Sequence, residues 1–375
     1  MTLIAAGRLG NNANNLTPPS NRREKRALRY ARRRLLNGLT TLPACRKCGR
    51  TRRDSRVGVK AAKGASERSG FSGLVTCGSV WACTVCNSKI MATRGTEISA
   101  GITTWMGQMS GSILLLTLTL QHDLGDRLDN QWDILLKAWT KTANGKVWKK
   151  YRDRLGAAGY IRATEVTDGA NGWHSHLHVL LFVENQDDYD EIDGFREWLC
   201  AKWARSVRSL GGDAKESVQD VRTIKGASDP AIAGYLTKSQ DSLGFELTHS
   251  QGKSERGRLG TKPYWYLLDE IADGDADALA RWHEVEAASK GRRQMSWSRG
   301  LRDVLGLRKE KTDEEIAEEV AGDSTLVYIP GEAWDDLQAH RAWLAPKILD
   351  AAEQGIGSLS RFLDGHSIQY ETEDA

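Results

Sequence analysis

The stretch GWHSHLHVLLF, residues 172–182, decides the fold. Side chains alternate between the two faces of a β-strand, so three histidines share one face: His174, His176 and His178. The interleaved apolar side chains are expected to enter the core: Leu177, Val179 and Leu181. Two imidazoles two positions apart on a strand can bind one divalent ion. Three of the chain's eight histidines lie here, so the pattern predicts metal or phosphate chemistry rather than a structural polar ladder.

A third ligand is expected beside these histidines. A hard cation that acts on phosphate prefers oxygen ligands as well as imidazoles. Glu165 lies on the preceding predicted strand, just before the DGANG loop. In the simple hairpin register Thr164 would face His176, so placing Glu165 beside the histidines needs a one-residue offset or a bulge. His122, at the end of another predicted strand, is the alternative ligand.

The surrounding chain alternates between strand-like and helix-like patterns. Apolar, β-branched segments predict strands over residues 112–121, 159–167, 174–183 and 218–224. Helical spacing of apolar residues is present over 129–156 and 190–210. This order predicts an α+β domain with a mostly antiparallel sheet.

A further helix is expected to begin at Asp229-Pro230, because Asp is a good N-cap and Pro suits the first turn. Tyr235 and Lys238 would then share one helical face. A phenol can attack phosphorus and form a phosphodiester that conserves the energy of the broken bond, and Lys238 could offset developing charge. A tyrosine on such a helix is usually a core residue; what supports the catalytic interpretation is its position about 60 residues after the histidines.

Three segments carry a resemblance to a known family. They are ILLLTLTLQHDLGDRL (113–128), ATEVTDGANGWHSHLHVLLF (163–182) and IAGYLTKSQ (232–240). The sequence resembles the HUH endonucleases, and within them the rolling-circle replication initiators of small plasmids, particularly those of actinobacteria. The resemblance extends over residues 75–310. It implies an HUH endonuclease domain with a central antiparallel sheet and helices.

The resemblance also implies an activity, that of a metal-dependent, site-specific single-strand DNA endonuclease that nicks and joins. His176 and His178 would bind Mg²⁺ or Mn²⁺. Tyr235 would attack the scissile phosphate of single-stranded or extruded origin DNA, become joined to the 5′ phosphate and free a 3′-OH primer. One position departs from the pattern: some plasmid initiators have a Glu one turn before this Tyr, where Ala231 stands here, which leaves the route of termination open.

Five cysteines predict a structural zinc site. Cys45-x-x-Cys48 and Cys83-x-x-Cys86 form two knuckles, and Cys77 lies six positions before Cys83. Four thiolates complete a site, so one of the five is spare. The symmetrical set of both knuckles and the set 48, 77, 83, 86 both remain open. The sixth cysteine, at position 200, is expected to be an inert core thiol.

Charge is distributed unevenly along the chain. Residues 1–70 hold 18 Lys and Arg against 3 acidic residues, whereas residues 313–375 hold 3 basic against 15 acidic residues. The predicted helix 21–36 is therefore interpreted as a nucleic-acid-binding arm, with a solvated charged helix as the alternative. Its expected DNA contacts are Arg29, Arg32, Arg33 and Arg34. The acidic region is expected to be folded and mostly helical, with a capping box at Thr312–Glu315.

The expected organisation is a series of consecutive regions. They are a lead and basic arm (1–43), a zinc module (44–95), a nuclease core (110–245), an associated segment (260–310) and an acidic helical region (311–375). We expect a cytoplasmic protein, because no apolar run approaches the roughly 20 residues of a membrane span and no secretory signal is present. No nucleotide-binding P-loop is found, so a host helicase and replication machinery are the expected partners.

Two other functions remain compatible with these patterns. One is a transposase or conjugative relaxase of the same superfamily, although familiar relaxases place the tyrosine before the histidines. The other is a non-catalytic, zinc-containing DNA-binding regulator, which would leave the histidine strand without a role.

Overall fold

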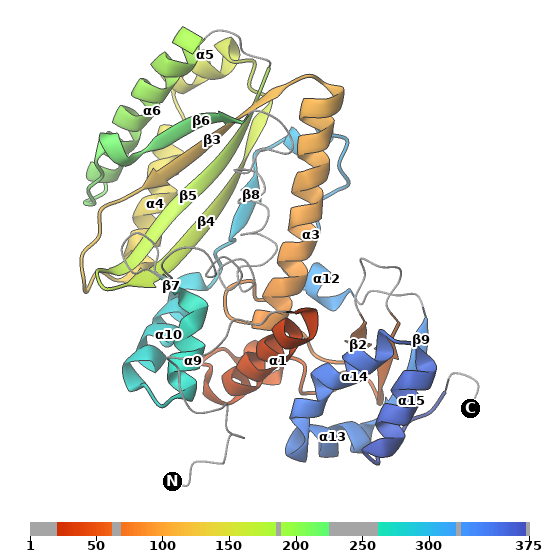
Figure 1. Cartoon of the computed structure of the whole chain (residues 1–375). Helices are drawn as coiled ribbons and strands as arrows, with labels where there is room; N and C mark the ends of the chain where they lie inside the picture. The colour runs from red at the N-terminus through yellow and green to blue at the C-terminus, as the bar shows by residue number, and fades with distance from the viewer. Residues whose placement is uncertain (1–20, 62–68, 185–188, 225–261, 320–323, 373–375) are drawn as a thin grey trace. The chain divides into compact units, whose positions relative to one another are not determined.

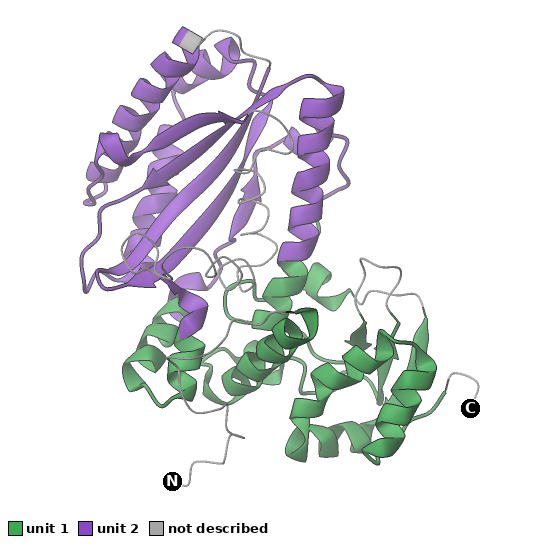
Figure 2. Ribbon diagram, in the orientation of Figure 1, with its two compact units in different colours: residues 1–90, 267–286, 311–375 green, residues 91–266, 287–310 purple. Residues whose placement is uncertain are grey.

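The computed structural model describes residues 21–61, 69–184, 189–224, 262–319 and 324–372. The chain forms two compact units, each assembled from separate segments (Figure 2). Unit 1 comprises residues 1–90, 267–286 and 311–375, and unit 2 comprises residues 91–266 and 287–310. The regions expected from the sequence are consecutive, whereas these units are not, so we describe each unit by itself.

Unit 2 contains a six-stranded sheet in which all strand pairs are antiparallel (Figure 1). From one edge to the other its strands are β6 (Asp220–Ile224), β3 (Ser112–Thr119), β5 (Gly172–Val183), β4 (Gly159–Gly169) and β7 (Lys262–Pro263), and β8 (Met295–Trp297) also pairs with β4. The expected α+β class with an antiparallel sheet is confirmed.

One face of this sheet is covered by helices. They are α4 (Leu128–Thr142), α5 (Lys146–Arg154) and α6 (Tyr189–Arg208). Leu177, Val179 and Leu181 are fully buried against them, as the alternation along the strand predicts. Helical spacing was expected over 129–156, but α4 ends at Thr142 and α5 begins after Gly145, whose φ of +93° favours glycine and interrupts the helical run.

The opposite face of the sheet carries the histidines. It is lined in part by a π-helix, η2 (Thr103–Gln108), which follows the long helix α3 (Thr84–Ile102). Trp105 of η2 packs edge-on against Phe182 of β5, with ring centroids 6.1 Å apart. Apolar packing thus covers one end of this face, and polar side chains occupy the other.

In unit 1, two strands from the N-terminal part of the chain and one from the C-terminal part form a three-stranded antiparallel sheet. Its strand order is β2 (Gly70–Ser72), β1 (Arg56–Lys60) and β9 (Thr325–Pro330). The helices are α1 (Arg22–Leu39), α2 (Pro43–Lys47), α9 (Leu267–Ala272), α10 (Ala276–Ser289), α12 (Asp313–Glu318), α13 (Gly331–His340), α14 (Ala345–Ala352) and α15 (Ile356–Gly365).

The acidic C-terminal region completes the core of unit 1. Trp334 of α13 is fully buried and packs edge-on against Phe71 of β2. The region is mostly helical, as expected, and the capping box between Thr312 and Glu315 is present in both directions. Among the described helices, none has the length and apolar character needed to span a membrane.

Candidate functional site

Three side chains converge on the polar face of the unit 2 sheet. Glu165 Oε2 lies 2.9 Å from Nε2 of His176 and 2.9 Å from Nε2 of His178. Glu165 and His178 are partly exposed, while His176 is 9% exposed. Ligands in adjacent positions around an octahedral ion at about 2.1 Å lie about 3 Å apart. The spacing and the oxygen–imidazole donor set therefore fit a hard divalent cation.

The hairpin that brings these residues together differs from the simple register expected. The turn contains only Ala170 and Asn171, since Gly169 pairs with Gly172. Glu165 therefore stands directly opposite His176, and Thr164 is paired with Leu177. The hairpin has the one-residue offset from the simple register that places Glu165 beside the histidines, and no bulge is needed. A shorter loop shifts the pairing by one residue and moves a whole set of side chains to the other face.

A neighbouring hydroxyl contacts one of the two imidazoles. Thr117 Oγ1 on β3 lies 3.3 Å from His178 Nδ1, on the side of the ring away from Glu165. Nδ1 of His176 is buried and has no hydrogen-bond partner within the described part of the chain. Both Nε2 atoms contact the carboxylate, which is the arrangement a shared ion requires.

The alternative ligand, His122, lies elsewhere. Its Nε2 is 2.9 Å from Nδ1 of His174, and its Nδ1 is 3.0 Å from the carbonyl oxygen of Asn171. Burial, followed by the nearby His176 and His122, lowers the pKa of His174 to about 4. The structure pairs His122 with His174 and leaves it outside the group of Glu165, His176 and His178.

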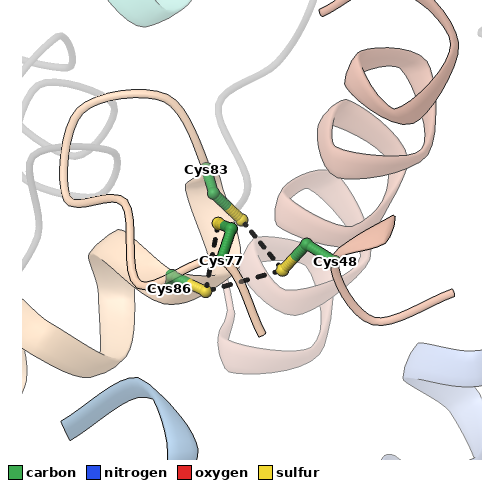
Figure 3. A group of neighbouring side chains, drawn as sticks. All are labelled: Cys48, Cys77, Cys83 and Cys86. Atoms are coloured by element: carbon green, nitrogen blue, oxygen red, sulfur yellow. Dashed lines mark hydrogen bonds between the residues drawn. The ribbon is translucent and has the colours of Figure 1, made fainter. Parts of the chain in front are cut away.

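Unit 1 contains a second cluster, formed by four cysteines (Figure 3). The Sγ atom of Cys48 lies 3.7 Å from that of Cys83 and 3.6 Å from that of Cys86, and Cys77 Sγ lies 3.7 Å from Cys86 Sγ. Four sulfurs at about 2.3 Å from a tetrahedral zinc ion lie about 3.8 Å apart. The cluster therefore fits a zinc site with four thiolate ligands, and it is the set 48, 77, 83, 86 that converges.

The fifth cysteine, Cys45, is buried but lies outside this group. Its thiol interacts with that of Cys77, which raises the pKa of Cys77, and the Asn37 side chain donates to the carbonyl oxygens of Cys45 (2.7 Å) and Cys48 (3.3 Å). Cys200 is buried on α6, and burial raises the pKa of its thiol, in agreement with an unreactive core residue.

The arginines expected to contact DNA are mostly in the interior of unit 1. Arg29, Arg32 and Arg33 are buried, and only Arg34 is exposed. Arg32 forms a two-point ion pair with Asp269 at 2.9 and 2.5 Å. The expectation of a free cationic arm is therefore corrected: these three side chains lie in the interior, and the charge of Arg32 is matched by an acidic partner far away in the sequence.

Arg33 has a role that sequence reasoning missed. Its guanidinium stacks on the Tyr30 ring at 4.4 Å and occupies the space that a Cβ on Gly49 would need. Hydrogen bonds from Cys77, Cys83 and Cys86, together with the charge of Arg33, hold the pKa of Cys48 well below its usual range. A cation buried beside Cys48 favours the deprotonated, metal-binding form of that thiol.

The expected nucleophile lies outside the described residues. Tyr235, Lys238, Asp229 and Ala231 all belong to the segment 225–261. The described residues therefore include the candidate ion ligands on β4 and β5 but not the tyrosine.

The chain is similar in sequence to a known protein family and to several known proteins. A family model described as "Replication protein" matches residues 75–342, more than half of the chain. The chain belongs to this family of replication proteins. A protein named "Protein rep" from Streptomyces lividans is 30% identical over 318 residues, which cover 68% of this chain and 69% of the relative. The resemblance to plasmid replication initiators is confirmed.

Other relatives of this replication protein are similar over shorter lengths. A "Neomycin resistance protein" from Streptomyces cyanogenus is 32% identical over 240 residues, or 55% of this chain and 54% of the relative. A "Protein rep" from Lentilactobacillus hilgardii is 31% identical over 180 residues, 43% of this chain and 54% of the relative. No solved structure matches this replication protein. The family match contains all candidate ion ligands and three of the four clustered cysteines.

Proposed function

We propose that this replication protein initiates rolling-circle replication of a plasmid by nicking one strand of the origin. The observation that carries the proposal is the convergence of Glu165, His176 and His178 on one face of the sheet, in a chain that belongs to a replication-protein family. A hard divalent cation held there would polarise a phosphate and orient it for in-line attack. Mg²⁺ and Mn²⁺ have the matching ligand preferences.

The protein's own groups would carry the strand transfer. In this proposal the phenol oxygen of Tyr235 attacks the scissile phosphorus, and its proton passes to solvent or a nearby base. The bond from phosphorus to the 3′ oxygen breaks, so the products are a 5′-phosphotyrosine link and a free 3′-OH primer. Lys238, three residues later, would offset the charge that develops on the phosphate. The transfer conserves bond energy, which allows the strand to be rejoined.

The two metal centres would have separate tasks. The imidazoles and carboxylate of unit 2 would position the scissile phosphate. The four thiolates of unit 1 would hold a zinc ion that stabilises a small module with few strands, since metal ligation contributes directly to folding.

The test is a covalent-adduct assay on a labelled single-stranded oligonucleotide from the candidate origin, with Mg²⁺ or Mn²⁺ present. Wild type should give a band of retarded mobility on a denaturing gel, and Tyr235→Phe should not. Tyr370→Phe, in unit 1, is the matched control and should retain the adduct. Tight binding of several origin fragments without any adduct in the wild type would instead favour a non-catalytic DNA-binding protein.

A further inference from the structure

A strongly basic surface follows the first cysteine knuckle. Residues 46–56, RKCGRTRRDSR, contain six cationic side chains and one acidic side chain. We call this segment the knuckle loop. Its cationic residues are Arg46, Lys47, Arg50, Arg52, Arg53 and Arg56, and all except Arg52 are exposed. Within the described residues, this loop exposes five cationic side chains, whereas helix α1 exposes three, Arg22, Arg23 and Arg34.

The knuckle loop is held by backbone hydrogen bonds. Its amides donate to three neighbours: Thr51 N to Lys47 O at 3.0 Å, Gly49 N to Val75 O at 2.7 Å and Arg53 N to Gly73 O at 2.8 Å. Gly49 has a φ of +63°, a conformation that favours glycine, and it makes room for Arg33. The cationic side chains are therefore displayed on a fixed backbone, which reduces the entropy lost on binding.

A hollow of about 580 Å³ lies between the knuckle loop and helix α13. Its charged lining residues are Arg50, Arg52, Arg53, Asp54 and Asp335, and Gln338 also lines it. Asp335 is bound by Arg52 at 3.1 and 2.8 Å, so its charge is already neutralised. Nε2 of Gln338 is buried without a hydrogen-bond partner among the described residues. Arg53 is likewise paired, with Asp54 at 3.5 Å. Arg50 is therefore the arginine of the lining for which the structure records no ion pair among the described residues, and its guanidinium can bind a phosphate.

The chemistry of this surface favours double-stranded over single-stranded DNA. Proteins that bind single strands combine a basic groove with exposed aromatic side chains on which bases stack. Neither the knuckle loop nor the lining of the hollow contains an aromatic residue. Guanidinium and ammonium groups without a stacking platform contact the phosphate backbone, which positions a protein on duplex DNA without reading its sequence.

We propose that the knuckle loop and the adjacent hollow bind the phosphate backbone of duplex DNA at the origin. The inference rests on the proposed function, because it supplies the contact that would hold the replication protein on the duplex while unit 2 acts on one strand. The residues expected to contribute most are Lys47 and Arg50, for which the structure records no ion pair within the described residues.

The test is a salt titration of duplex binding by the double variant Lys47→Gln/Arg50→Gln. Each phosphate contact contributes about 0.9 to the slope of log K against log salt, so the slope should fall by about 2 and binding at 0.1 M salt should weaken by tenfold or more. The matched control is Lys347→Gln/Arg361→Gln, two exposed cations on α14 and α15 of the same unit, whose slope should equal that of wild type. A double variant with wild-type slope and affinity would overturn the proposal.

Two further measurements separate this inference from the proposed function. The double variant should form the covalent adduct on the single-stranded oligonucleotide with wild-type yield, and it should retain zinc and its thermal midpoint, because both side chains are exposed. Loss of affinity for single-stranded DNA as large as that for duplex DNA would overturn the assignment to duplex. If wild type forms no adduct, the proposed nicking fails, while the salt slopes still decide whether the knuckle loop binds duplex DNA.

Discussion

Glu165 and His176 stand directly opposite each other on strands β4 and β5, with 2.9 Å between the carboxylate Oε2 and the imidazole Nε2. Their pairing depends on a turn of two residues, Ala170 and Asn171. The candidate ion site is therefore a direct consequence of hairpin register. Each of the three candidate ligands, Glu165, His176 and His178, can be tested by a single substitution.

Replacing the carboxylate should remove ion binding. In Glu165→Gln the side chain keeps its shape but loses its negative charge, so Mn²⁺ affinity measured by calorimetry should fall at least tenfold. His122→Ala is the control, because His122 contacts His174 and lies outside the ligand group. Unchanged affinity in Glu165→Gln combined with loss in His122→Ala would move the ion to the His122–His174 pair.

Removing one clustered thiol should release zinc. Cys48 Sγ lies within 3.7 Å of two other sulfurs in the cluster, so Cys48→Ser should lower the zinc content measured by elemental analysis. Its thermal midpoint should fall with it, since metal ligation contributes to folding. Cys45→Ser provides a matched control, because Cys45 is also buried but lies outside the cluster. Zinc loss in Cys45→Ser with retention in Cys48→Ser would reverse this assignment.

The buried arginine of helix α1 should contribute to stability. The Arg32 side chain is 3% exposed and its partner Asp269 is 15% exposed. Truncation in Arg32→Ala leaves a carboxylate without its cation and should cost about 3 to 5 kcal/mol of unfolding free energy. Arg34→Ala, at an exposed position of the same helix, should change it by less than about 0.5 kcal/mol. Urea denaturation measures the unfolding free energy of both variants. If Arg32→Ala kept its stability but bound DNA more weakly, the interpretation of this helix as a DNA-binding arm would be restored.

The capping box at the start of α12 should also be measurable. Thr312 Oγ1 accepts from Glu315 N at 3.1 Å, and the Glu315 carboxylate accepts from Thr312 N at 2.7 Å. Thr312→Ala removes one of these bonds and should lower the unfolding free energy by about 1 kcal/mol. Thr96→Ala, within helix α3 and exposed, should leave stability nearly unchanged. Equal unfolding curves for wild type and Thr312→Ala would contradict a stabilising cap.

The sequence alone determined the local features of this protein. Alternation along residues 172–182 assigned the histidines to one face of a strand and Leu177, Val179 and Leu181 to the other, and the structure agrees. The capping box between Thr312 and Glu315 was also predicted from the sequence, and its partners are three residues apart. Such features depend on neighbours within one or two turns of chain, and those neighbours can be read directly from the sequence.

Features that depend on distant partners were decided only by the tertiary structure. The hairpin register followed from turn geometry, which placed Glu165 opposite His176 without a bulge. The choice among five cysteines required the fold to bring Cys48 next to Cys86, 38 residues later. The partner of Arg32 lies 237 residues away, so charge density along α1 could not show that this arginine is buried. Burial and ion pairing depend on which surfaces meet in three dimensions, and one-dimensional periodicity carries no information about that.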